Sequence, residues 1–340
     1  MFTRRKCISV VAPLVGALAC VALMTPAQAK PPSLDPGGVS TSILNSKGRL
    51  AGTYWTKERM LSAKPVPVPK LSAKADADLR QQAKPQGPAG KVNGVAVAKT
   101  STDKIGARSG ASAETWWGSA TSAPATTSGK VFFTGADGLN YVCSASTVNS
   151  AGKSVVFTAG HCLSNGAGTW YNSKPWIFVP GYKNGNAPYG QWYARQLWTR
   201  PAWHNGGNRA EDIGAALMYP QNGTAIVNRV GGQGIEWNYP LSQFQYQFGY
   251  PQRAPFNGQL LKYCTGNSYN DAGHNGINCN MTEGASGGPW LDDFNGSFGR
   301  LDSVNSWVFW NAAGTRYKWN GPYFGNNARD FYQVVTAAEL

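Results

Sequence analysis

Histidine, cysteine and acidic residues are scarce in this sequence, and each shortage argues against a kind of site. The chain holds three histidines, six cysteines and 17 acidic residues in 340 positions. No Cys-x-x-Cys or His-x-x-x-His pair occurs, so the spacings typical of zinc sites are missing. Scattered acids such as Asp292 and Asp293 leave a structural ion open, but they lack the spacing of a calcium loop. No metal site and no organic cofactor is predicted.

Long apolar runs are also missing after the first 29 residues. Arg4, Arg5 and Lys6 precede an apolar run that ends in Ala-Gln-Ala at residues 27–29. This pattern is typical of a secretory signal peptide, so residues 1–29 are expected to be removed from a secreted, extracellular protein that keeps no membrane anchor. The adjacent arginines leave both twin-arginine and general secretory export open.

Dense clusters of basic residues are absent from the larger part of the chain, although its formal net charge is +14. Residues 1–29 carry three bases and no acid, residues 30–115 carry 14 bases and six acids, and residues 116–340 carry 14 bases and 11 acids. Most of the excess therefore lies in segments expected to be removed. Nucleic acid is not predicted as a partner.

Residues 30–115 are rich in Pro, Ala, Lys, Ser and Gly, and we interpret them as a pro-segment or linker. They offer too little apolar surface to offset the entropy lost on ordering, so most of this segment is expected to be disordered. The exception is a short helix that Thr56 caps, with Glu58 in its first turn and Pro65 after its end. Such a helix favours a segment that docks on the folded domain, and a flexible spacer is the alternative.

Residues 116–340 change to Trp, Tyr, Gly and Asn with many short strand-like runs, which indicates one large all-β domain. A terminal helix is expected near residues 328–338, where Phe331, Val334 and Val335 share a face. The expected strands are KVFFTG, YVCSASTV, SVVFTAG, PWIFVPGY, QWYARQLWTR, DIGAALMYP, AIVNRV, QYQFGYP, LLKYC and LDSVNSWVFW.

Four cysteines remain once the signal is removed, and an exported chain meets oxidising conditions in which disulfides form. Three pairings are possible. Cys143 with Cys162 and Cys264 with Cys279 are favoured, because each pair closes a short segment between strand-like runs.

One histidine, one acid and one serine lie in tightly specified sequence contexts. His161 ends an apolar strand in TAGHC, Asp212 opens the strand DIGAAL, and Ser286 stands in GASGGP. A hydroxyl needs a neighbouring base to become a nucleophile, and a buried carboxylate can orient that base. His204 and His274 lie in turn-like stretches and are expected to be solvated loop residues.

The glycines beside Ser286 have a mechanical explanation. Backbone N–H groups of Gly284 and Ser286 could converge on a developing oxyanion only if the chain adopts a conformation that a side chain at Gly284 would obstruct. Gly287 and Gly288 would allow substrate and neighbouring strands to approach closely.

The order TAGHC, DIGAAL, GASGGP is similar to that of the chymotrypsin-like serine peptidases, most closely their secreted bacterial branch. The resemblance covers about residues 116–340 and implies two packed six-stranded β-barrels with a C-terminal helix and an active site between the barrels. It implies His161 as general base, Asp212 as its orienting acid, Ser286 as nucleophile, and Gly284 with Ser286 as oxyanion donors. Protein or peptide substrates and a monomeric enzyme are expected.

Ala285 departs from the family pattern. Members that are activated by a newly freed N-terminus usually carry an acid directly before the nucleophile, where it receives the new ammonium group. With alanine there, we expect a zymogen that is activated when removal of its pro-segment relieves a block, without that ion pair.

The specificity pocket is less clearly marked. Trypsin-like members carry an acid six residues before the nucleophile, where this chain has Asn280. Glu283 stands near the expected rim, and Asn305, Ser306 and Trp307 belong to the stretch that resembles the substrate-pairing strand. An uncharged, polar or medium-sized residue is expected before the cleaved bond.

The alternative hypothesis is a non-catalytic carbohydrate- or cell-wall-binding protein on a peptidase-like scaffold. Its basis is the enrichment of Trp, Tyr and Asn in the expected loops, because exposed aromatic rings can stack on sugars.

Overall fold

The computed structural model of the chain describes much of the molecule, but not its start. The predicted signal peptide, residues 1–29, and the stretches 30–39, 44–53, 68–83 and 98–109 of the predicted pro-segment lie outside the described residues. No helix within the described part is long and apolar enough to cross a membrane. The described residues are 40–43, 54–67, 84–97, 110–116, 118, 120–271, 273–310 and 316–339.

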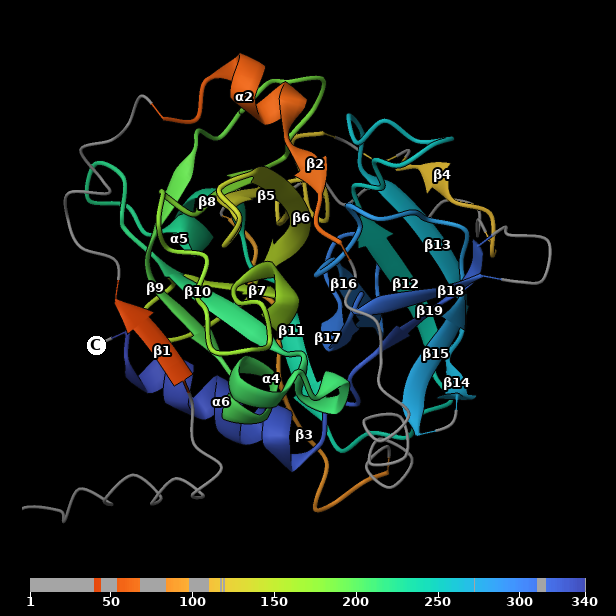
Figure 1. Cartoon of the computed structure of the whole chain (residues 1–340). Coiled ribbons are helices and arrows are strands. Elements are labelled where there is room, and N and C mark those ends of the chain that lie inside the picture. Colours follow the sequence, from red (N-terminus) through yellow and green to blue (C-terminus); the bar gives the residue numbers. More distant parts are fainter. Residues whose placement is uncertain are drawn as a thin grey trace, which may run out of the picture. The chain divides into compact units, whose positions relative to one another are not determined.

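Six strands close into a barrel in the first half of the domain, drawn in yellow to green in Figure 1. The ring closes because β8 pairs with β5 on one side and with β9 on the other. Side chains such as Val131, Phe157 and Ala215 fill it and are fully buried. In order around the ring the strands are β8 (Ile177–Pro180), β5 (Ser128–Thr134), β6 (Asn140–Thr147), β7 (Val155–Thr158), β10 (Gly214–Met218) and β9 (Trp192–Thr199).

The second half consists of two further sheets, drawn mainly in teal to blue. A disulfide joins them, because Cys264 lies on β13 and Cys279 directly follows β15. The seven-stranded sheet has the order β3 (Gly90–Val92), β11 (Gly234–Trp237), β17 (Arg300–Val304), β16 (Pro289–Asp292), β12 (Phe244–Gly249), β13 (Lys262–Asn267) and β4 (Glu114–Thr115). The four-stranded sheet has the order β14 (Tyr269–Asp271), β15 (His274–Asn278), β19 (Arg316–Gly321) and β18 (Trp307–Trp310).

A C-terminal helix, α6 (Asn326–Ala337), packs on the first barrel although it comes from the far end of the chain (Figure 1). Phe331 and Val335 are fully buried, and the Phe331 ring lies 5.8 Å from that of Phe157 on β7. The all-β class with a six-stranded barrel and a C-terminal helix is confirmed.

One expected strand is wrong. Residues 225–230, AIVNRV, form the short helix α5 (Ile226–Val230). Its buried residues are Ile226, Val227 and Val230, whereas Asn228 and Arg229 are exposed. This is a helical period, which the abundance of β-branched residues concealed.

The short helix predicted within residues 30–115, the predicted pro-segment that we call the leader, is confirmed, and it docks on the barrel. Helix α2 (Lys57–Ser62) begins after Thr56, whose side chain accepts a hydrogen bond from the backbone N of Arg59. Met60 and Trp55 are buried in the core, and the Trp55 indole donates to the backbone of Pro175. The chain then forms β2 (Lys64–Pro65), which pairs in parallel with β6, and upstream β1 (Ser40–Ile43) pairs with β9.

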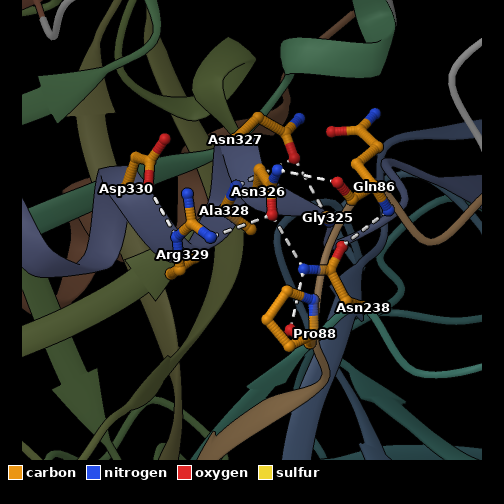
Figure 2. Close-up of polar contacts among 9 residues, drawn as sticks. All are labelled: Gln86, Pro88, Asn238, Gly325, Asn326, Asn327, Ala328, Arg329 and Asp330. Carbon is orange, nitrogen blue, oxygen red and sulfur yellow. Dashed lines mark hydrogen bonds and ion pairs between the residues drawn. The ribbon is translucent and has the colours of Figure 1, made fainter. Parts of the chain in front are cut away.

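Residues 84–97 dock on the second half instead. Strand β3 pairs with β11, and Figure 2 shows how Asn238 fastens the chain before it. The Asn238 amide donates to the Pro88 carbonyl and to Asn326 Oδ1, and its oxygen accepts from the backbone N of Gln86. Asn326 in turn donates to the Gln86 carbonyl, so this part of the leader is tied to the start of α6.

Candidate active site

His161 and Asp212 meet because two barrel strands are antiparallel neighbours. Strand β7 ends at Thr158, opposite Gly214 at the start of β10. The short helix η1 (Gly160–Cys162) that follows β7 therefore lies beside the turn that precedes β10. Asp212 Oδ2 lies 2.8 Å from His161 Nδ1, and Asp212 Oδ1 accepts the backbone N–H of His161 at 2.7 Å. Each residue is 1% exposed.

A third donor completes the surroundings of Asp212. The Ser306 hydroxyl, from the link between β17 and β18, donates to Asp212 Oδ2. A buried carboxylate is costly unless it is hydrogen-bonded, and these three donors compensate it. The imidazole is held at Nδ1, which leaves Nε2 for another partner.

Ser286 lies in the loop of residues 284–288 between β15 and β16, which we call the nucleophile loop after the role expected for Ser286. Ser144 on β6 fastens this loop to the first barrel: its backbone N donates to the Ser286 carbonyl at 2.7 Å and its hydroxyl to the Gly284 carbonyl at 2.9 Å. A Cβ on Gly287 would lie 2.0 Å from Thr158 Oγ1, at the end of β7. The loop therefore contacts the strand that leads directly into His161.

A disulfide reinforces this junction. The structure joins Cys143 to Cys162, the pairing favoured from the sequence, as it does Cys264 and Cys279. Cys143 directly precedes Ser144, and Cys162 directly follows His161. The bridge thus connects the neighbour of Ser144, which supports the nucleophile loop, with the neighbour of His161.

The polar atoms that would do chemistry are buried and unpaired within the described part of the chain. Neither Ser286 Oγ nor His161 Nε2 has a hydrogen-bond partner there. Across the same residues, the backbone N–H groups of Gly284 and Ser286 also lack an acceptor. Buried polar groups are normally paired, and here unpaired ones coincide with the serine, the histidine and the N–H groups that the sequence pattern assigns to chemistry. A hydroxyl, an oriented imidazole and two free N–H groups suit attack on a carbonyl.

Glycine is required in this loop by contact and by conformation. Gly284 has φ +99°, and a Cβ there would lie 2.7 Å from the Tyr250 carbonyl. A Cβ on Gly288 would lie 2.0 Å from the Phe248 carbonyl. Side chains at these positions would push the loop away from β12.

Two of the expected pocket residues are engaged by other parts of the chain. Asn280 Oδ1 accepts the backbone N–H of Ala113 at 2.7 Å, and its own N–H donates to the Ala111 carbonyl at 3.0 Å. The residues just before the predicted domain start thus lie against Asn280. Glu283 forms an ion pair of 3.2 Å with the largely exposed Arg253.

The other three expected pocket residues differ in their surroundings. Ser306 turns its hydroxyl to Asp212, as described above. Trp307 is 2% exposed and packs edge-on against His274, with ring centroids 4.3 Å apart, while the Arg209 guanidinium lies 5.2 Å from its ring. Asn305 is fully buried, and its amide bonds to the nucleophile loop and to neighbouring strands.

The expectation that His204 and His274 are solvated is wrong. His204 is 7% exposed and stacks on Trp170 at 4.5 Å, and His274 is 1% exposed beneath Trp307. Burial lowers the pKa of His204. Turn-like composition misled here, because aromatic side chains distant in sequence cover both rings.

A metal does not fit the cluster of potential ligands at this site. Within the described residues, Cys143, His161 and Cys162 lie close enough together to hold an ion. Both sulfurs are consumed in the disulfide, so neither cysteine offers a thiolate.

Sequence reasoning missed Ser144 as a support of the site. It stands beside Cys143 in a strand-like run, where nothing distinguishes it from other small residues. Its hydroxyl and backbone N–H find their partners only when the other half of the domain approaches: the carbonyls of Gly284 and Ser286 accept from them, and the Tyr250 N–H donates to the hydroxyl.

Comparison with known proteins gives a consistent result. No model of a known protein family and no curated protein matches the sequence. The protease Anisep from Arthrobacter nicotinovorans is 40% identical, with a TM-score of 0.59, over 64% of this chain and 98% of its own. The thermostable serine protease AL20 from an extremophilic microorganism is 37% identical, with a TM-score of 0.59, over 63% and 98%. A Glu endopeptidase at 19% identity, with a TM-score of 0.53 over 68% and 99%, supports the fold alone. Similarity over almost the whole length of two such proteases, together with the barrel fold, shows that the chain belongs to the chymotrypsin-like serine peptidases.

Proposed function

We propose that this protein is a secreted serine endopeptidase that cleaves peptide bonds through an acyl-enzyme. Ser286 Oγ attacks the carbonyl carbon of the scissile bond while His161 Nε2 takes its proton. The oxyanion that forms is stabilised by the N–H groups of Gly284 and Ser286, and Asp212 stabilises the imidazolium.

The second half of the reaction uses the same groups. The His161 imidazolium gives its proton to the leaving amine, and the acyl group stays on Ser286 Oγ. Water then attacks the ester with His161 again as base, which releases the acid and restores the hydroxyl.

The observation that carries the proposal is the docking of the nucleophile loop on the strands that hold His161. Ser144 donates to the carbonyls of both Gly284 and Ser286, and His161, which pairs with Asp212, follows β7, against which Gly287 lies. The signal pattern at residues 1–29 and the two disulfides support export.

The test is Ser286→Ala in the processed enzyme, with peptide hydrolysis as the readout. Loss of the nucleophile should lower kcat by about 10⁶, the scale found when a catalytic serine is removed. Ser128→Ala on β5 is the matched control, because the Ser128 hydroxyl is also buried and unpaired among the described residues. Undiminished hydrolysis by Ser286→Ala would exclude the proposal.

The carbohydrate-binding alternative gains no support from the tryptophans on which it was based. Nine of them are buried and pack in the interior, where they cannot stack on a polysaccharide. They are Trp55, Trp116, Trp176, Trp192, Trp198, Trp203, Trp290, Trp307 and Trp319.

Specificity remains a prediction that one experiment addresses. Digestion of a diverse peptide mixture by the processed enzyme, followed by sequencing of the cleaved bonds, should show uncharged residues before the cut, because Asn280 provides no charge. Enrichment of Arg and Lys, or of Glu and Asp, at that position would contradict it.

A further inference from the structure

The side chain of Asn305 lies directly behind the nucleophile loop and is fully buried. Its Nδ2 donates to the Ala285 carbonyl at 2.8 Å and to the Phe248 carbonyl at 3.0 Å. Its Oδ1 accepts from the Trp290 indole at 2.6 Å and from the Gln247 amide. One amide thus connects the loop to β12 and β16.

The orientation of this amide follows from its partners. An indole N–H can only donate and a backbone carbonyl can only accept. The atom facing Trp290 must therefore be the oxygen, and the atom facing Ala285 and Phe248 must be the nitrogen. Asparagine is needed here because it combines a double donor and an acceptor on a short side chain.

The backbone of Asn305 also binds the nucleophile loop. Its carbonyl accepts the Gly287 N–H at 2.7 Å, and its N–H donates to the Gly288 carbonyl at 2.9 Å. Together with the bond to the Ala285 carbonyl, Asn305 contacts the residue before Ser286 and the two residues after it. Asn305 therefore contacts the peptide groups on both sides of Ser286, and among the described residues outside the loop it alone holds the one before Ser286.

The loop has no charged anchor of its own. Ala285 is fully buried and offers no group that could bind an ammonium. The peptide unit between Ala285 and Ser286 carries both the carbonyl that Asn305 holds and the Ser286 N–H. Because a peptide unit is planar, fixing its carbonyl also fixes the direction of its N–H.

We propose that Asn305 is the positioning residue that fixes the Ser286 N–H as an oxyanion donor, in place of an ion pair at position 285. The inference rests on the proposed function, because it assigns a purpose to the geometry of that same site. A neutral amide holds the loop without waiting for a new N-terminus, so the oxyanion geometry is already present before processing.

The test compares Asn305→Ala with Gln233→Ala in the processed enzyme. Gln233 is the matched control: it is also a fully buried amide, donating to Thr127 and Ser297 and accepting from the Gly299 N–H, and it makes no contact with the nucleophile loop. Loss of one oriented oxyanion donor lowers kcat by about 10²-fold or more, so Asn305→Ala should show a drop of this size with a much smaller change in KM. Asn305→Asp, which places oxygen against two carbonyls, should lose at least as much.

A peptide boronate provides a readout that general destabilisation would not change. Its tetrahedral adduct on Ser286 uses the oxyanion donors, so its affinity should fall in parallel with kcat in Asn305→Ala and stay near the wild-type value in Gln233→Ala. Equal losses of kcat in the two variants, or an Asn305→Ala enzyme with kcat within threefold of wild type, would overturn the inference.

Hydrogen exchange separates this inference from the proposed function. In Asn305→Ala the Gly287 and Gly288 amides should exchange at least tenfold faster than in wild type, and in Gln233→Ala they should not. If these amides exchange faster in Asn305→Ala but the wild-type protein hydrolyses no peptide, the proposed function is contradicted while Asn305 is still the anchor of the loop. Unchanged exchange would refute the anchoring itself.

Discussion

Asp212 illustrates how one side chain depends on the elements around it. Its two oxygens accept from His161 Nδ1, from the His161 backbone and from the Ser306 hydroxyl. The sequence predicted an acid that needs a partner at the mouth of a strand. It could not reveal Ser306 as a partner, because the link between β17 and β18 reaches Asp212 only in the folded molecule.

Replacing Asp212 by Asn should lower kcat by about 10⁴, because the amide favours the wrong imidazole tautomer and no longer stabilises the imidazolium. The measurement is steady-state hydrolysis of a peptide substrate. Asp330→Asn, which alters only a partly exposed pair with Arg329 on α6, should be unaffected. Equal activity of the two variants would argue against the assigned role of Asp212.

Lys130 is a second residue with an unusual environment. It is fully buried on β5, where its Nζ donates to Gln252 Oε1 at 2.6 Å and to the Gly258 carbonyl at 3.0 Å. Burial disfavours its charged form and lowers its pKa to about 7. Between pH 7 and the usual lysine pKa of about 10.5, the unfolded chain therefore binds more protons than the folded one.

The free energy of unfolding of the wild type should consequently contain a contribution from Lys130 that rises with pH across that window. The Lys130→Met variant lacks this contribution. The difference in the free energy of unfolding, wild type minus variant, should grow by up to about 1.4 kcal/mol per pH unit between pH 7.5 and 9.5. Urea unfolding at several pH values measures it. A difference that stays constant or shrinks with pH would show that Lys130 keeps its charge.

Secondary-structure elements can be predicted where the composition or the spacing of apolar residues fits one kind of element. Most barrel strands are short runs rich in β-branched and aromatic residues, and α6 has a clear helical face. The short α5 was not predicted, because its β-branched residues are typical of strands while its burial follows a helical period. The pairing of β2 with β6 and of β3 with β11 could not be predicted, because proline- and glycine-rich segments carry no period that specifies a partner.

The two disulfides close segments of similar length, with sequence separations of 19 and 15, but they have different neighbours. Replacing either pair by alanine should lower stability by about 3 kcal/mol, measured by chemical unfolding. Activity below the melting transition should fall more when Cys143 and Cys162 are replaced, because that bridge joins the residues next to Ser144 and His161. A larger loss of activity from the Cys264 and Cys279 replacement would refute this reasoning.

Two described segments of the leader bind different halves of the domain. Residues 54–67 dock on the first barrel, and residues 84–97 dock on β11 and the start of α6. Strand β2 runs parallel to β6, which continues past the paired residues to Ser144, the residue that holds the nucleophile loop (Figure 1). The N–H of Val66 donates to the Val142 carbonyl, so residues 64–66 lie along the part of β6 that directly precedes Cys143 and Ser144.

The unprocessed secreted form should therefore hydrolyse peptides much more slowly than the trimmed form. Trp55→Ala in the unprocessed form should restore part of the activity, because it removes a buried anchor of the docked segment and its hydrogen bond to Pro175. Peptide hydrolysis before and after trimming measures both effects. Equal rates for the unprocessed and trimmed forms would show that the leader imposes no block.

The pairing of β3 with β11 has a consequence for handling the processed enzyme. Among the described residues, β11 pairs with β17 on one side and with the leader on the other, where Ile235, Glu236 and Trp237 pair with residues 90–92. If trimming removes β3, the peptide groups along that side are left facing water. An open strand edge is a template for pairing with another chain, so removal of β3 would leave the trimmed enzyme more prone to self-association at high concentration.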